Sequence, residues 1–285
     1  MSIRIIILGD IVGTPGRLAV AQCLPALREQ YEADLVVVNG ENVANGSGIT
    51  PDLYKKLIGS GVDGITLGDH VYKKRQIVPV LERESNIIRP ANLPRGAAGR
   101  TWMRLDPGGN RPAVYFFTVL GRVFMNMPIS EPFAAIDQVM SQLPESEPIV
   151  IAEIHAEATS ERQAVGWYLN GRAAAVFGTH THVPTADARL LPTDVVGGGG
   201  RIGPGGTAYV SDLGMCGPMD SVLGRRVDRV LSHMTTSMPT PYDVADGRPM
   251  VQGIFLEIDE RARQAVRIER IEMEADPSRP PFASA

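Results

Sequence analysis

The sequence lacks the features that mark secreted and membrane proteins. Its 285 residues include only two cysteines, Cys23 and Cys216, which form neither a disulfide framework nor a CxxC pair. This cysteine usage favours a reducing, cytoplasmic location. No apolar run approaches the roughly 18 residues that a membrane span needs. The N-terminus has no charged region followed by a cleavage site, so we expect no signal peptide.

Excess basic charge is also missing. The 28 Lys and Arg residues face 32 Asp and Glu residues, which leaves a formal net charge of −4. Because affinity for nucleic acid comes largely from neutralised phosphates, this balance argues against a duplex nucleic acid as partner. It leaves a small phosphorylated substrate open. Arg225, Arg226 and Arg229 form a small basic cluster, which is either a solvated helix face or an anchor for a substrate phosphate.

Short apolar runs alternate with helical patterns in the first third of the chain. Residues 3–8 predict a strand that is buried on both faces, and residues 35–39 and 64–67 predict two further strands. Thr50 is placed to cap a helix that starts at Pro51 and runs to about residue 60. This order of strand, loop and helix is typical of parallel strands covered by helices.

Antiparallel pairing is expected later in the chain. Residues 113–119 and 122–127 flank Gly121 and predict a hairpin, and residues 251–258 and 265–272 predict a second one. Between them, Ser160 and Gln163 have the spacing of a capping box, and further buried strands are predicted at residues 148–154, 173–177 and 208–211.

The domain organisation follows from the absence of a clear linker or internal repeat. We expect residues 1–275 to form a single α/β domain with a mixed or doubled sheet. A glycine-rich excursion is expected at residues 197–206. The proline-rich residues 276–285 predict a disordered tail.

Polar side chains gather at the ends of five predicted strands. They are Asp10, Glu41, Asn42, Asp69, His70, His155, His180 and His182. Ligands of open α/β folds bind where the carboxyl ends of such strands meet. Imidazoles with carboxylates suit Zn, Fe or Mn. Eight groups are too many for one tetrahedral ion and suit two ions that share a bridging carboxylate, as in sites that clamp a phosphoryl group.

Each of these residues taken alone has a plainer interpretation. A lone histidine at a strand end is more often a hydrogen-bonded structural residue. Asp10 could cap a helix, and Glu41 could be a solvated loop charge. His180 and His182 are harder to explain in this way, because residues i and i+2 of an extended segment point in the same direction.

Seven ordered segments together resemble one family. They are residues 9–17 (GDIVGTPGR), 39–50 (NGENVANGSGIT), 68–70 (GDH), 89–92 (RPAN), 155–161 (HAEATSE), 166–187 (GWYLNGRAAAVFGTHTHVPTAD) and 211–220 (SDLGMCGPMD). The chain resembles the calcineurin-like metallophosphoesterases and, more closely, their YmdB-like branch of bacterial 2′,3′-cyclic nucleotide phosphodiesterases.

The resemblance implies a fold, a cofactor and a reaction. The fold would be a four-layer αββα sandwich of two mixed sheets flanked by helices, with a dimetal centre at the strand ends. The ions would be iron, with manganese or zinc as alternatives. The reaction would be hydrolysis of a small phosphodiester, above all a 2′,3′-cyclic nucleotide, by hydroxide generated at the two ions. No membrane partner is implied, and a homo-oligomer is left open.

The resemblance also implies a role for each strand-end residue. The ligands of the first ion would be Asp10, Glu41, Asn42 and His182, with Glu41 bridging. The second ion would be completed by Asp69, His155 and His180. His70 would stand outside the coordination shell as the general acid that protonates the leaving oxygen.

The chain departs from the family pattern at four places. Asp69 stands where the family has asparagine, and Tyr72 stands where it has tryptophan. The first strand lacks the histidine of the superfamily's DxH, for which the branch uses Asn42. Residues 197–206 look inserted. The alternatives are therefore a broader phosphatase or nuclease, or a metal-stabilised regulatory protein whose hydrolysis is incidental, an interpretation that Asp69 favours.

Overall fold

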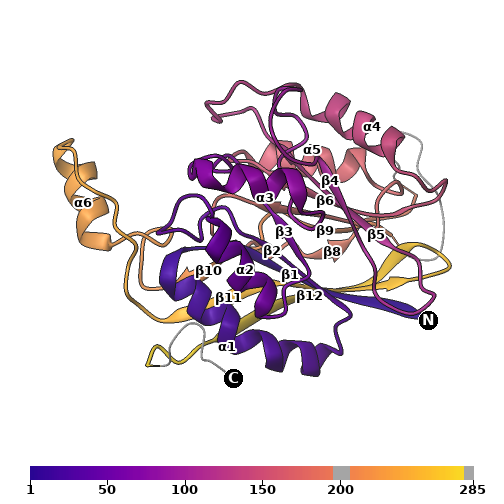
Figure 1. The fold of residues 1–285 in the computed structure, drawn as a ribbon, viewed down its shortest axis with the longest axis horizontal. Coiled ribbons are helices and arrows are strands. Elements are labelled where there is room, and N and C mark those ends of the chain that lie inside the picture. Colours follow the sequence, from indigo (N-terminus) through magenta and orange to yellow (C-terminus); the bar gives the residue numbers. More distant parts are fainter. Residues whose placement is uncertain (195–205, 279–285) are drawn as a thin grey trace.

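Two stacked sheets with helices on their outer faces make up the fold (Figure 1). The computed structural model describes residues 1–194 and 206–278. The first sheet has the order β12 (Gln264–Glu274), β11 (Pro249–Asp259), β10 (Met215–Pro218), β1 (Ser2–Ile11), β2 (Leu35–Asn39), β3 (Gly64–Thr66). The second has the order β4 (Trp102–Leu105), β5 (Val114–Leu120), β6 (Ile149–His155), β7 (Ala175–Thr179), β9 (Ala208–Val210), β8 (Arg189–Leu190). The helices are α1 (Gly13–Tyr31), α2 (Pro51–Gly59), α3 (Val78–Arg83), α4 (Pro132–Gln142), α5 (Thr159–Tyr168) and α6 (Val227–Thr236), with a 3₁₀ turn at Arg75–Ile77.

The alternation of side chains along β1 explains why the sheets are buried on both faces. Ile3, Ile5 and Ile7 point into the apolar layer between the two sheets. Ile6 and Leu8 point the other way, into the layer shared with α1 and α2. Successive residues of a strand face opposite sides, so an unbroken run of isoleucine and leucine serves both layers.

A third apolar layer lies on the outer face of the second sheet. Tyr115 and Phe117 of β5 pack there against Ile136 of α4 and Val165 of α5. The order of layers is therefore helix, sheet, sheet, helix, as Figure 1 shows. This is the αββα sandwich of two mixed sheets that the resemblance implied.

Parallel pairing brings the ends of several strands to one edge. In the first sheet, β1, β2 and β3 are parallel neighbours. In the second sheet, β5, β6 and β7 are parallel neighbours. The carboxyl ends of parallel strands share an edge, so the segments that leave these strands collect the side chains of a site.

Most elements predicted from the sequence are confirmed. The strand over residues 35–39 and the helix from Pro51 occur as expected, and the Thr50 side chain accepts a hydrogen bond from the Leu53 amide at 3.3 Å. The hairpin at residues 251–258 and 265–272 is the antiparallel pair β11 and β12.

The hairpin expected over residues 113–127 is wrong. β5 pairs with β4 on one side and with β6 on the other, and residues 122–127 form turns and irregular structure. The carboxylate of Glu161 accepts hydrogen bonds from the amides of Arg122 and Val123 at 2.8 and 3.0 Å. A side chain therefore takes the donors that a strand partner would have used.

The capping box expected at Ser160 and Gln163 is also wrong. Helix α5 begins at Thr159, its N-cap is Ala158, and no side chain caps it. Ser160 thus lies inside the first turn. Arg162 fixes the segment that leads into this helix, because its Nε donates to the Ala156 carbonyl at 2.8 Å. This bond is no substitute for a cap, since no side chain in the described ranges accepts from the first amides of the helix.

Some expectations fall wholly or partly outside the described residues. The glycine-rich stretch is described only at Gly206, whose amide donates to the Ala265 carbonyl at 3.2 Å. Of the expected tail, residues 276–278 are described, and the Asp276 amide donates to the Gln22 side chain at 2.9 Å. Within the described ranges, no helix has both the length and the apolar character that a membrane span requires.

Candidate metal centre

The two sheets contribute different chemistry to the shared edge. The segments at the ends of β1, β2 and β3 carry Asp10, Glu41, Asn42, Asp69 and His70. The segments at the ends of β6 and β7 carry His155, His180 and His182. Every carboxylate of the predicted ligand set therefore comes from the first sheet, and every histidine of that set comes from the second. Only the stacking of the sheets brings them together.

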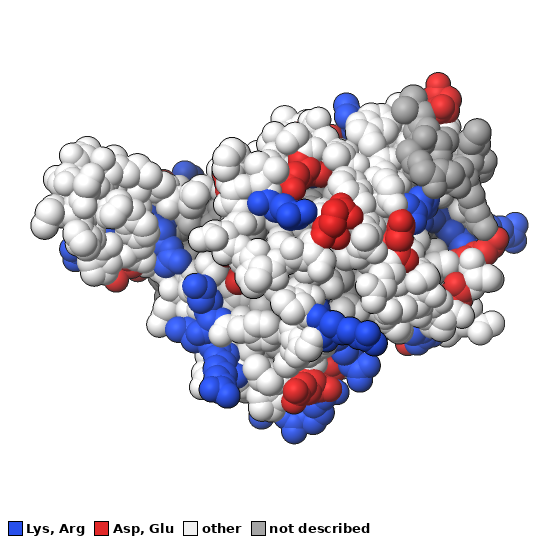
Figure 2. Space-filling view, turned by 90° about the horizontal axis from the view of Figure 1, so that it is seen from above, with Lys and Arg blue, Asp and Glu red and all other residues white. Residues whose placement is uncertain are grey.

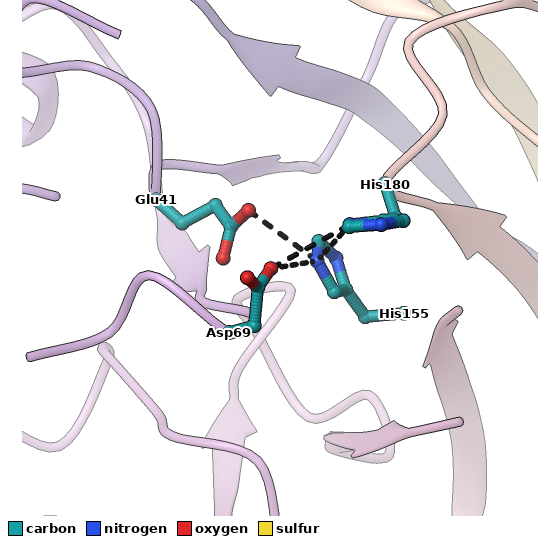
Figure 3. A group of neighbouring side chains, drawn as sticks. All are labelled: Glu41, Asp69, His155 and His180. Atoms are coloured by element: carbon teal, nitrogen blue, oxygen red, sulfur yellow. Dashed lines mark hydrogen bonds and ion pairs between the residues drawn. The ribbon is translucent and has the colours of Figure 1, made fainter. Parts of the chain in front are cut away.

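Four of these side chains converge on one point (Figure 3). One ligand atom from each of Glu41, Asp69, His155 and His180 lies within 4.8 Å of the others. Nε2 of His155 is 3.0 Å from Asp69 Oδ1 and 3.3 Å from Glu41 Oε1. Nδ1 of His180 is 3.1 Å from the same His155 nitrogen. Two carboxylates and two imidazoles thus surround a common centre.

A second group lies beside the first and shares Glu41. The Asn42 amide nitrogen is 3.2 Å from Glu41 Oε1, 3.2 Å from His182 Nε2 and 3.5 Å from Asp10 Oδ1. The Asn42 amide oxygen faces the other way and accepts from His70 Nδ1 at 2.8 Å. The donor NH₂ of Asn42 therefore lies where three acceptor atoms meet, which is an environment that also stabilises a cation.

Hydrogen bonds below the site determine which nitrogen His155 presents. Thr179 lies opposite His155 on the neighbouring strand, and its hydroxyl donates to Glu153 Oε1 at 2.5 Å. A hydroxyl has one hydrogen, so the same oxygen accepts from His155 Nδ1 at 2.9 Å. His155 is then protonated at Nδ1, and its Nε2 is the nitrogen that faces Asp69 and Glu41.

The Glu153 carboxylate also joins the two sheets beneath the site. It is fully buried and accepts from Thr118 Oγ1 at 2.9 Å and from Asn39 Nδ2 at 2.7 Å. Asn39 belongs to the first sheet, and its side-chain oxygen accepts from the Glu41 amide at 3.0 Å. One buried carboxylate therefore positions His155 through Thr179 and Glu41 through Asn39.

His180 and His182 do not lie in the extended segment that the sequence analysis assumed. Both have left-handed backbones, with φ of 101° and 61°. As a result they point to different groups, His180 toward Asp69 and His182 toward Asp10. His182 Nδ1 donates to the Leu223 carbonyl at 3.0 Å, so its Nε2 faces the site.

The residue between these histidines is held by a buried ion pair. Asp212 accepts from the Thr181 amide at 3.2 Å and from its hydroxyl at 2.7 Å. Its partner is Arg162, whose Nη1 is 2.9 Å from Asp212 Oδ2. Arg162 also donates to the carbonyl of Thr179 at 3.1 Å. These bonds stabilise a backbone that non-glycine residues adopt at a cost.

The electrostatics of the site favour positive charge at its centre. Burial raises the pKa of Asp10 to about 7, against the pull of His155. Burial alone would lower the pKa of His155, but the charge of Glu41 and the bond to Asp69 raise it well above its ordinary value. Burial opposes ionisation of Asp69, but hydrogen bonds from His155 and His180 hold its pKa below the usual range. A proton on His155 offsets the carboxylates, as a bound cation would.

Several residues of this network were not predicted from the sequence. Glu153 carried a signal, because it is an acid in an otherwise apolar buried strand that ends at His155. Glu157, 3.3 Å from His180 Nε2, and Asp212 carried none that separates them from surface acids.

The phosphate anchor considered for the basic cluster stays a prediction: the three arginines have partners within the protein, and Arg225 also lines a cavity together with His70, His180 and His182. Arg225 donates to the Tyr242 carbonyl at 2.9 Å and also bonds to the carbonyls of Asn45 and Gly46. Arg226 pairs with Asp228, and Arg229 lies 3.7 Å from Asp243.

Comparison with known proteins places the chain in a family. The sequence model of the YmdB-like protein family matches residues 6–271. The chain belongs to the YmdB-like family. The 2′,3′-cyclic-nucleotide 2′-phosphodiesterase of Bacillus subtilis (strain 168) is 40% identical to it over 268 residues, which cover 94% of this chain and 96% of that protein.

Two solved structures share the fold over nearly the whole chain. A hypothetical protein from Thermus thermophilus superposes with a TM-score of 0.85 at 37% identity, covering 96% of this chain and all of that one (100%). A novel phosphatase from Mycoplasma pneumoniae gives a TM-score of 0.85 at 30% identity, covering 97% and 95%.

The donor set fits the metal ions that the YmdB-like fold implies. The carboxylates of Asp10 and Glu41 are almost fully buried, and such charges persist in an interior only beside opposite charge. His155 and His182 each direct Nε2 toward the carboxylates, because Nδ1 of each ring donates to another group, and a cation would take the place of the proton that His155 carries at Nε2. Mixed imidazole and carboxylate donors are typical of transition-metal sites.

Proposed function

We propose that this chain is a metal-dependent phosphodiesterase that hydrolyses 2′,3′-cyclic nucleotides. The observation that carries the proposal is the convergence of Glu41, Asp69, His155 and His180 within 4.8 Å at the carboxyl ends of strands from both sheets. The Bacillus subtilis relative, which is 40% identical over nearly the whole chain, is a 2′,3′-cyclic-nucleotide 2′-phosphodiesterase, and this supports the choice of substrate.

The predicted ligand set divides into two groups around Glu41. One ion would be held by Glu41, Asp69, His155 and His180. The other would be held by Asp10, Asn42 and His182 with Glu41, once the Asn42 amide turns its oxygen toward them. The Asn42 NH₂ would then donate to His70 Nδ1, which leaves the ring proton of His70 on Nε2. Bound in this way, the ions would supply a nucleophile at neutral pH and neutralise charge on the phosphoryl oxygens.

His70 is the residue that we assign to protonation of the leaving oxygen. Its Nδ1 donates to the Asn42 oxygen at 2.8 Å, and its amide donates to Glu41 Oε2 at 3.0 Å. The ring is thereby oriented beside the ligands without belonging to their cluster. Its Nε2, 3.5 Å from Asp69 Oδ2, is the nitrogen left to carry a proton to the substrate.

Metal analysis combined with turnover tests the proposal. The purified, metal-replete protein should contain two transition-metal ions per chain and should hydrolyse 2′,3′-cAMP faster than an aryl phosphomonoester. Preference for the monoester would support the broader phosphatase instead. Bound metal without turnover of any ester would support the regulatory alternative, which Asp69 favours.

Replacement of His70 tests its role separately. His70→Gln should retain both ions and lose roughly 10²–10⁴-fold in kcat on 2′,3′-cAMP, the usual cost of a missing general acid. Bis(p-nitrophenyl) phosphate, whose leaving group needs little protonation, should lose much less. Equal losses on both substrates would remove His70 from this role.

Three finer assignments belong to the same proposal. Iron is the metal that we propose, with manganese or zinc as alternatives; in each case the donors suit the ion. A cytoplasmic location agrees with two buried, unpaired cysteines, Cys23 and Cys216. Residues 1–275 are proposed as one domain, supported by apolar layers that combine residues from both ends of the chain.

A further inference from the structure

The cavity beside the metal centre has two chemically different walls. Its volume is about 250 Å³. One wall is polar and consists of Glu41, Asn42, His70, His180 and His182. The other wall is formed by Val222, Leu223, Val230, Met234 and Tyr242, and Arg225 also lines the cavity. A molecule bound at the strand ends therefore lies against an apolar surface, which we call the apolar wall.

Hydrogen bonds connect the apolar wall to the residues of the metal centre and to the loop after β2. The Leu223 carbonyl accepts from His182 Nδ1 at 3.0 Å. Arg225 donates to the Tyr242 carbonyl at 2.9 Å and to the Asn45 carbonyl at 3.4 Å, which ties the wall to the loop after β2. Its guanidinium therefore keeps its positive charge at the edge of the cavity, while its bonds to backbone oxygens hold the apolar side chains of the wall in place.

Solvent reaches much of this wall. Met234 is 69% exposed and Tyr242 is 43% exposed. Helix α6, which carries Met234, extends away from the two sheets in Figure 1, and the side of this projection visible in Figure 2 is largely free of charged side chains. Contiguous exposed apolar side chains beside a polar cluster are typical of a ligand-binding surface.

We propose that the apolar wall is the subsite for the nucleobase of a mononucleotide ester whose phosphate lies at the strand-end cluster. The proposal rests on the proposed function, because that function places the phosphate. A flat base packs favourably against the Tyr242 ring and the Met234 thioether. The cavity is smaller than the roughly 300–1,000 Å³ of drug-sized pockets, which favours one nucleotide over an oligonucleotide.

Helix α6 contains a matched control. Leu231 is 52% exposed and lies on the same helix, but it does not line the cavity. A second copy of the chain covering α6 would contact Leu231 as well as Met234. A nucleobase in the cavity would contact Met234 and Tyr242 only.

The test compares two cyclic esters that differ only by the base. kcat/KM is measured for 2′,3′-cAMP and for ribose 2′,3′-cyclic phosphate with the metal-loaded wild type and the variants Met234→Ser, Tyr242→Ala and Leu231→Ser. Met234→Ser and Tyr242→Ala should lower kcat/KM for 2′,3′-cAMP relative to kcat/KM for ribose 2′,3′-cyclic phosphate by roughly 5- to 100-fold, the range found for stacked bases. The change should lie mainly in KM, and Leu231→Ser should keep the wild-type ratio.

Other outcomes overturn the proposal. Equal losses on both esters would show that the wall does not contact the base. Losses with Leu231→Ser, accompanied by a change in sedimentation, would show that a second copy covers the wall. If the wild type hydrolyses neither ester, the proposed function fails, and adenosine binding then decides the subsite. Adenosine should bind the wild type more tightly than Met234→Ser, and equal binding would refute the subsite.

Discussion

At the scale of single residues, the site depends on which nitrogen each histidine presents. His155 donates from Nδ1 to Thr179, and Thr179 donates in turn to Glu153. His182 donates from Nδ1 to a backbone carbonyl. Both rings therefore direct Nε2 toward carboxylates without any choice of tautomer. The groups that accept from the two Nδ1 atoms, the Thr179 hydroxyl and the Leu223 carbonyl, are uncharged. The charged Glu153 acts on His155 only through Thr179.

Thr179 offers a clean test of this arrangement. Thr179→Val removes the hydroxyl at almost constant volume, so His155 loses its acceptor and Glu153 loses a donor. We expect metal affinity to fall roughly 10–100-fold, as for other groups that orient a metal ligand. Thr179→Ser should restore it. Metal retained against increasing chelator measures the effect, and equal retention in the valine variant would contradict the assigned role.

As a proposed ligand, Asp69 would add an anionic group where the resemblance implies asparagine. Its Oδ1 lies 3.0 Å from His155 Nε2 and 3.5 Å from His180 Nδ1. An anionic ligand holds a cation more tightly and leaves it a weaker Lewis acid. Asp69→Asn should therefore lose metal to a chelator sooner and shift the acidic limb of the pH–rate profile to lower pH. If neither property changes, Asp69 is not a ligand.

At the scale of elements, the segment after β7 directs two nearby histidines to different groups of carboxylates, which a regular strand would not do because residues i and i+2 of a strand point the same way. Two left-handed histidines, separated by Thr181, send one imidazole to each group of carboxylates. Such a backbone needs support from its surroundings. Asp212 and Arg162 provide it, from the segment after β9 and from α5.

This support predicts a strong dependence on Asp212. Asp212→Asn leaves the Arg162 charge buried without its partner, which costs about 3–5 kcal/mol of stability in comparable pairs. We expect a lower Tm and loss of bound metal, because both histidines depend on the segment. Asp228→Asn is the control, since Asp228 and Arg226 lie at the same 2.9 Å separation but in solvent. Equal Tm values for the two variants would show that the buried Arg162–Asp212 pair contributes no more to stability than the exposed Arg226–Asp228 pair.

At the scale of the whole molecule, the interface between the two sheets ends in a concentration of buried charge. Asp10, Glu41 and Glu153 are nearly inaccessible to water. They lie at the end of an otherwise apolar layer that contains Phe116 and Phe177. Stability of the fold and loading of the site are therefore linked, because cations stabilise the state that holds them.

The metal-free protein should show this link as a pH dependence. The pKa of folded Asp10 is about 7, above its ordinary value of 3.8, so the folded chain binds the extra proton more tightly. This group's contribution to stability is full below pH 4 and is lost as the pH rises to 7. Asp10→Asn carries no such charge. It should be more stable than chelated wild type at pH 8 by a few kcal/mol, with little advantage at pH 4.

Thermal unfolding of both proteins in chelator measures this difference. Glu41, Asp69 and His155 are present in both proteins, so the difference between them reports the charge of Asp10 together with its coupling to Glu41 and His155. A difference in Tm that does not vary between pH 4 and 8 would contradict the raised pKa of Asp10.

The sequence alone determined most of the strands and helices and the set of polar residues at the strand ends. An unbroken run of isoleucine and valine is a local pattern in the sequence, and so is a helix cap such as Thr50. The layers followed from the resemblance and from parallel strand order. The site residues were predictable because the end of a parallel strand is fixed by its own residues.

Only the tertiary structure decided how those residues are used. The pairing of β5 with β4 and β6, the left-handed backbone at His180 and His182, and the roles of Glu153 and Asp212 depend on partners far along the chain. The apolar wall likewise faces the metal centre only after folding. The physical reason is that a hydrogen-bond donor or an exposed apolar side chain has many possible partners in the sequence, and packing selects one.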